Sequence, residues 1–172
     1  MAKNKKIDLV ALIVFGVLLV SIIMVVVGVC IDWTVTTGTS VGGESVNKLK
    51  LSDWAEANSK AKDGIDGYGV MTAFAYITLV LTILTAVAFV VSKFVNVKVL
   101  KWVVVGIAAL TVISAIVLIA TTYSFCANYK VDLNIFGWSI ANAKTAPAAG
   151  PWLAAIFGIV GGAAGAVGAL KK

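Results

Sequence analysis

The sequence predicts an all-α membrane protein, in which a four-transmembrane-helix bundle carries a small extracellular α/β subdomain. Of the 172 residues, 60% are hydrophobic and 13% are charged. A hydrocarbon core about 30 Å thick is crossed by about 20 helical residues, and four apolar runs reach that length. Helices satisfy backbone amides that find no water in lipid. We therefore predict a single four-span membrane domain over 1–172, with spans at about 7–31, 68–92, 99–124 and 151–170 and outer loops at 32–67 and 125–150.

The distribution of lysine predicts the orientation of these spans. The amino end, the 93–101 turn and the carboxyl end together hold eight lysines and one aspartate, whereas the two outer loops hold six lysines and seven carboxylates. Because basic residues are retained on the cytoplasmic side, we expect a multi-pass plasma-membrane protein with both termini cytoplasmic. Basic residues at that face favour anionic membrane lipid. Nucleic-acid binding is not expected, because it needs a basic groove with accessible aromatics.

The outer loops contain short elements and a repeated segment. Runs at 33–37 and 47–51 alternate in strand fashion and predict a hairpin, which is followed by a short helix beginning near Trp54. In the second loop, 131–135 alternates and a short helical segment is predicted from Trp138. WAEANSKA at 54–61 matches WSIANAKT at 138–145, with these pairs: Trp54 and Trp138, Asn58 and Asn142, Lys60 and Lys144. The match predicts a parallel internal repeat of span, strand, Trp-headed helix and span. Chance identity over so short a window is the alternative.

The two cysteines lie near the outer ends of two predicted spans. Cys30 ends the first span and Cys126 follows the third. An oxidising exterior favours a disulfide between them, which would tie the first helix to the third. The alternative is a pair of free, buried thiols that pack as small apolar groups.

The fourth span is rich in small residues at helical spacing. Two overlapping GxxxG patterns let a second helix approach closely. The packing residues are Ala154, Gly158, Gly161, Gly162, Gly165 and Ala166. Packing inside the monomer and oligomerisation through this face are both open on the sequence alone.

Reactive groups are scarce along the chain. No charged residue interrupts the apolar runs at 9–31, 67–92, 102–127 and 151–170, and the chain has no histidine to act as a base or in a conventional zinc site. We therefore expect no enzyme, no cofactor and no metal centre. Thr78, Thr82 and Thr85 share one helix face, and they are the basis of an alternative, a small transporter or channel component that forms a path between subunits.

The first outer loop resembles a known family of four-span proteins. Trp33 and the run Leu51-Ser52-Asp53-Trp54 are similar to the tryptophan and the Gly-Leu-Trp motif of the claudin and peripheral-myelin-protein type of tetraspan. Four spans with a longer first and a shorter second outer loop resemble that family over the whole chain. The chain departs from it in lacking the cysteine pair that follows the motif. The resemblance implies strands in the first outer loop and contacts between neighbouring molecules through the outer loops.

These observations together predict a function without catalysis. We expect a tetraspan of the cell envelope that acts through lateral or extracellular protein–protein contacts, as a structural, adhesion or accessory subunit. Its expected partners are membrane lipid and either other membrane proteins or further copies of itself.

Overall fold

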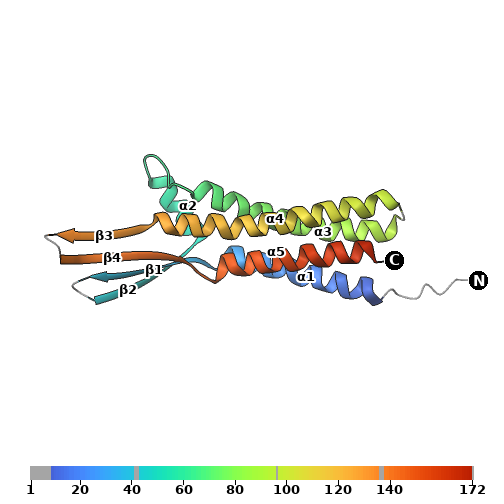
Figure 1. The fold of residues 1–172 in the computed structure, drawn as a ribbon, viewed down its shortest axis with the longest axis horizontal. Helices are drawn as coiled ribbons and strands as arrows, with labels where there is room; N and C mark the ends of the chain where they lie inside the picture. Colours follow the sequence, from blue (N-terminus) through green and yellow to red (C-terminus); the bar gives the residue numbers. More distant parts are fainter. Residues whose placement is uncertain (1–8, 41–42, 96, 136–137, 172) are drawn as a thin grey trace, which may run out of the picture.

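Four long helices form an elongated bundle, and a sheet extends from one end of it (Figure 1). The computed structural model describes residues 9–40, 43–95, 97–135 and 138–171. The bundle helices are α1 (Leu9–Cys30), α3 (Tyr68–Phe94), α4 (Lys98–Asn128) and α5 (Ala149–Leu170). All four are long and apolar enough to cross a membrane. The prediction of four long apolar helices is therefore confirmed.

The ends of these helices follow from local sequence. Gly67 precedes α3 with a φ of +78°, a left-handed conformation that glycine adopts without steric cost. Pro151 lies in the first turn of α5, where a missing backbone N–H costs no helical hydrogen bond. The carboxyl end of α4 extends to Asn128, four residues beyond the predicted span.

One helix, α5, packs against all three of the others. It adjoins α1 on one side and α4 on the other, and it also meets α3, whereas α1 and α4 are not packed against each other. Helix α3 completes the bundle between α4 and α1. The order around the bundle is therefore α1, α5, α4, α3.

Glycines set how closely these helices approach. A Cβ added at Gly28 of α1 would lie 2.7 Å from the backbone nitrogen of Ala154 and 2.8 Å from the carbonyl oxygen of Gly150. A Cβ added at Gly162 would lie 2.8 Å from the carbonyl oxygen of Ala108 in α4. Real Cβ atoms do not come so close to backbone, so α5 can hold this position only with glycine there.

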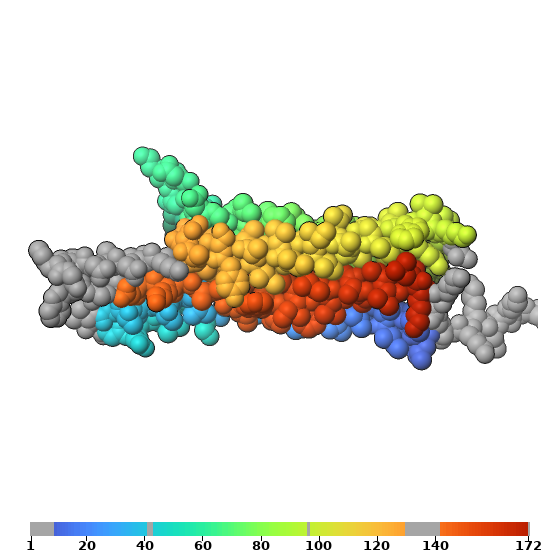
Figure 2. Space-filling model, viewed as in Figure 1, coloured from blue at the N-terminus to red at the C-terminus, as the bar shows by residue number. Residues whose placement is uncertain are grey.

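The sheet consists of two hairpins that meet through their inner strands. Its strands are β1 (Asp32–Ser40), β2 (Gly43–Lys50), β3 (Lys130–Ile135) and β4 (Trp138–Pro147), in the order β2-β1-β4-β3. Every neighbouring pair is antiparallel. The short helix α2 (Leu51–Lys60) follows β2, and in Figures 1 and 2 the segment around it stands out from the side of the bundle.

The predicted second Trp-headed helix is wrong. Residues 54–60 are helical as predicted, but the matching residues from Trp138 onward form β4. The reason is tertiary pairing, because β4 binds β1 on one side and β3 on the other. The two central strands also differ in position, because β1 is the first strand of its hairpin and β4 is the second strand of its hairpin. The two segments with matching sequence therefore do not form a structural repeat.

A substitution at Gly28 tests the packing of α1 on α5. Gly28→Ala should lower the free energy of unfolding by about 1–3 kcal/mol, because the new methyl group meets backbone that cannot rotate away. Gly16→Ala is the matched control in the same helix, since a Cβ there has no atom within 4 Å. Unfolding in detergent, followed by circular dichroism, compares the two variants. Equal stabilities would contradict this interface.

Candidate functional site

The sheet is fixed to the bundle by two buried tryptophans. The indole N–H of Trp33 donates to the carbonyl oxygen of Gly28, at 2.9 Å, and so ties β1 to the last turns of α1. The indole N–H of Trp54 donates to the Thr34 hydroxyl oxygen, at 2.8 Å, and so ties α2 to β1. Both indoles are buried. Burial of a large ring with its polar atom satisfied makes each a strong local anchor.

Trp54 also belongs to an aromatic cluster at the end of α4. Its ring meets Phe125 edge-on with centroids 4.9 Å apart, and it meets Tyr129 at 5.2 Å. Desolvation by burial, and second the negative charge of Asp66, raise the pKa of Tyr129 above its ordinary value. These contacts bring α2, α4 and the segment before α3 together under the base of the sheet.

The remaining residues of the repeated motif do not assemble into one site. Asn58 accepts a hydrogen bond from the backbone N–H of Ile65, at 2.6 Å, and so closes the turn after α2. Lys60 forms an exposed ion pair with Glu56. Asn142 and Lys144 lie on β4. Of Trp138 only the backbone is described. Its place at the head of the repeated segment predicts that its side chain packs the outer subdomain, and this prediction lies outside the described residues.

Beyond the base of the sheet, β2 and the outer end of β1 are exposed. Thr37, Thr39 and Ser40 are exposed on β1, and every residue of β2 except Leu49 is exposed. Each side of a pleated sheet takes alternate residues, so Thr37 and Thr39 share one face with their partners Val46 and Glu44. Strands in a small sheet are stable only with a buried face or a packed helix. In this sheet the anchored base provides that packing.

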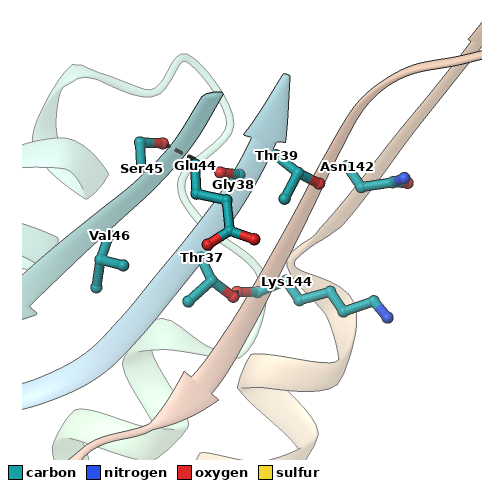
Figure 3. A pocket seen from close by; sticks show the side chains of 8 residues that line it. All are labelled: Thr37, Gly38, Thr39, Glu44, Ser45, Val46, Asn142 and Lys144. Atoms are coloured by element: carbon teal, nitrogen blue, oxygen red, sulfur yellow. Dashed lines mark hydrogen bonds between the residues drawn. The ribbon is translucent and has the colours of Figure 1, made fainter. Parts of the chain in front are cut away.

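A shallow polar hollow lies on that face of the sheet (Figure 3). Its volume is about 460 Å³, and it is lined by Thr37, Gly38, Thr39, Glu44, Ser45, Val46, Asn142 and Lys144. Figure 3 shows the side chains of Glu44, Thr37 and Lys144 on the same side of the three strands. Hydroxyl, amide, carboxylate and ammonium groups there can all form hydrogen bonds. The sequence pattern did not identify this hollow, because its residues come together only when β1 pairs with β4.

The outer strand β2 leaves one edge of the sheet unpaired. Among the described strands, β1 is its one neighbour, so alternate backbone N–H and C=O groups of β2 face away from the sheet. Such an edge can accept a further strand. The hollow and this edge together, defined by Gly43–Lys50 with Thr37, Thr39, Asn142 and Lys144, form the outer contact surface.

The predicted disulfide is wrong, because both cysteines are free. Cys30 ends α1 and is exposed, while Cys126 lies in the last turn of α4 and is buried. The two helices occupy opposite corners of the bundle, with α3 and α5 between them. A disulfide needs Cα atoms within about 7 Å, which that arrangement does not provide.

The small residues of the fourth span lie inside the bundle. Gly158 and Gly165 face the methyl groups of Thr78 and Thr85 on α3, and Gly161 faces Ser21 on α1. Ala154 and Gly162 are also buried, and Ala166 is half-buried. The face that carries both GxxxG patterns is therefore occupied by helices of the same chain.

The threonines of α3 lie against these glycines. Thr78, Thr82 and Thr85 are all fully buried. The Thr78 hydroxyl donates to Ser114, at 3.2 Å, and the Thr85 and Thr111 hydroxyls lie 2.9 Å apart. The Thr82 hydroxyl donates to the carbonyl oxygen of Thr78 one turn earlier. Hydroxyls satisfied in this way bind helices together, at about 1 kcal/mol or less each.

Among the described residues, no group of three or more histidine, cysteine, aspartate or glutamate side chains could hold a metal ion. Comparison with known protein families, with curated proteins and with solved structures found no match for this chain.

Thiol labelling tests the correction to the cysteine prediction. A membrane-permeant maleimide should add once to the unreduced protein, because Cys30 is exposed and the Cys126 side chain is only 2% exposed. Intact-protein mass spectrometry counts the adducts, and Cys30→Ala should remove the single one. Labelling that requires prior reduction would show that the two thiols are bonded after all.

A double-mutant cycle tests the anchor between α2 and β1. Trp54→Phe and Thr34→Val each remove one partner of the hydrogen bond, so their effects on the free energy of unfolding should be non-additive by about 1 kcal/mol. Chemical denaturation in detergent measures the four proteins. Strictly additive effects would mean that the indole and the hydroxyl do not interact.

Proposed function

We propose that this chain is a multi-pass protein of the plasma membrane, with both termini cytoplasmic and the sheet outside. In this proposal it has no catalytic activity and works through protein–protein contacts made by its outer contact surface. The observation that carries the proposal is a four-stranded sheet that extends beyond the bundle with exposed faces and an unpaired β2 edge.

The surface of the bundle supports membrane insertion. Large apolar side chains are exposed on all four long helices, for example Ile23, Val80, Ile113 and Ile156. Soluble proteins rarely expose apolar patches larger than a few hundred Å². In the hydrocarbon of a membrane, the exposure of these apolar side chains has no free-energy cost.

The charges support the orientation. Lys93, Lys98, Lys101 and Lys171 lie at the end of the bundle opposite the sheet, which we call the basic end. All seven carboxylates of the described residues lie in the sheet, in α2 or in the segment between α2 and α3. Because basic residues are retained in the cytoplasm, this distribution supports a topology with the sheet outside.

The packing of α5 favours contacts through the sheet over lateral contacts through glycine. The GxxxG face is buried within the chain, so it is not available to a neighbouring molecule. The β2 edge and the polar hollow are available to an added strand or an exposed loop of a partner. The claudin-like resemblance implies the same mode of contact, and we include it in the proposal.

The transport alternative has no comparable support. It depended on Thr78, Thr82 and Thr85 lining a path between subunits, but these side chains are buried against α5. Their hydroxyls are bonded to neighbouring side chains or to the preceding turn.

Labelling in intact cells tests the orientation. In a background with Cys30→Ala, a membrane-impermeant maleimide should label Val46→Cys on β2 and should spare Val99→Cys at the start of α4. The two valines are matched, with side chains 61% and 69% exposed. After permeabilisation both should react. Labelling of Val99→Cys in sealed cells would contradict the proposed topology.

Cross-linking tests the mode of contact. A short bis-maleimide applied to intact cells should give covalent adducts from Val46→Cys, either with a second copy or with another protein. Val87→Cys, on the exposed face of α3, is the lateral control and should give few. Adducts from the helix position alone would replace the sheet contact with a lateral one.

A further inference from the structure

One groove on the bundle differs from the other hollows among its described helices in having a lysine at one end. It lies between α1 and α3, the least closely packed pair of neighbouring helices in the bundle. One hollow, of about 310 Å³, is lined by residues that include Ala11, Phe15, Val90 and Lys93. A second, of about 280 Å³, shares Phe15 and Val90 with the first and continues to Ile83. The two hollows form a single groove, the α1–α3 groove.

The length of this groove corresponds to one leaflet of a bilayer. Along α3 it runs from Ile83 to Phe94, which at 1.5 Å per residue is about 16 Å. Half of a hydrocarbon core about 30 Å thick is about 15 Å. The groove begins at the basic end, so it lies in the leaflet that the proposed topology makes cytoplasmic.

The lining of the groove fits a hydrocarbon chain. Apart from Lys93, every described residue that lines either hollow is apolar. A flexible acyl chain gains dispersion contacts along such a surface, and a helix from a second copy is the competing occupant.

The charge at the mouth of the groove selects the head group. Among the described residues, Lys93 is the one charged residue that lines either hollow. Its ammonium lies 5.3 Å from the centre of the Phe89 ring and 3.3 Å from the carbonyl oxygen of Gly168. Within the described part of the chain, the other charged residues at this end are Lys98, Lys101 and Lys171. A phosphate with net negative charge is favoured in this field.

We propose that the α1–α3 groove is a binding site for one anionic phospholipid of the cytoplasmic leaflet, with an acyl chain along Phe15 and Val90 and its phosphate at Lys93. This inference rests on the proposed insertion of the chain in a membrane. Free phosphate is not the ligand, because the groove below Lys93 is lined by hydrocarbon.

Native mass spectrometry tests the lipid site. The protein is released from vesicles that hold equal amounts of phosphatidylglycerol and phosphatidylcholine, and the retained lipid is counted for each class. The wild type should keep one phosphatidylglycerol in preference. Lys93→Gln should reduce that preference about fivefold, the factor for about 1 kcal/mol per charge, and Lys93→Arg should restore it. Lys98→Gln, an equal loss of charge at the same end but outside the lining of the groove, should reduce it by a smaller factor.

A second pair of variants tests the acyl chain. Ala11→Phe fills the groove and should abolish retention of both lipid classes. Ala109→Phe, on an exposed face of α4 away from the groove, should retain lipid as the wild type does. Circular dichroism confirms folding of each variant, and Lys93→Gln stands as the test if Ala11→Phe fails to fold.

Three results would overturn the lipid site. The first is an equal loss of the phosphatidylglycerol preference in Lys93→Gln and Lys98→Gln. The second is equal lipid retention by Ala11→Phe and Ala109→Phe. The third is a lipid-free dimer of the protein in place of the lipid-bound monomer. Resistance of the protein to extraction from membranes at alkaline pH is measured in parallel. Extraction would contradict insertion itself, whereas an inserted chain without lipid preference would contradict only this site.

Discussion

The structure depends on the close approach of α5 to the other three long helices. In the membrane setting that we propose, there is no hydrophobic force between helices, so van der Waals contact and interhelical hydrogen bonds hold them together. Glycine at positions such as 28, 158 and 162 removes the side chain that would separate the backbones. At Gly158 and Gly165 the space is filled by the methyl groups of Thr78 and Thr85 from α3. The hydroxyls of these threonines bond within α3 or to α4.

This packing determines what the molecule can offer to a partner. Because α5 uses its small-residue face internally, lateral association through that face would require the bundle to open. The sheet, in contrast, uses little of its described surface for packing against the bundle. Its base is buried through Trp33, Thr34 and the aromatic cluster, while β2 and the outer part of β1 are exposed. The part of the chain suited to protein contact is therefore the part that the bundle does not need.

The sequence predicted the long helices well, because about 20 apolar residues in a row have no other stable arrangement in lipid. It also predicted the first hairpin, whose alternation is local. The sequence-based prediction failed where pairing between strands far apart in the chain determines the secondary structure. The segment from Trp138 resembles the α2 segment in sequence, but pairing with β1 across more than a hundred residues makes it a strand.

The two remaining site predictions failed or were left open for a related reason. The glycine spacing in α5 predicted a closely packed partner helix. It did not distinguish α1, α4 and a helix of a second molecule as that partner. The position of Cys30 and Cys126 at one end of the bundle was inferred correctly, yet the order of helices around the bundle separates them. The polar hollow was not predicted because its residues come from β1, β2 and β4.

The most direct test of the central claim is oxidative cross-linking at the α4–α5 interface. A Cβ at Gly158 would lie 3.2 Å from the Cβ of Ala115, close to the separation of about 3.8 Å in a disulfide. In a chain without its native cysteines, Ala115→Cys combined with Gly158→Cys should form a bond within one molecule, seen as a monomer of altered mobility. Gly158→Cys alone should give no covalent dimer. A dimer from Gly158→Cys alone would show that this face meets another molecule and would contradict the account.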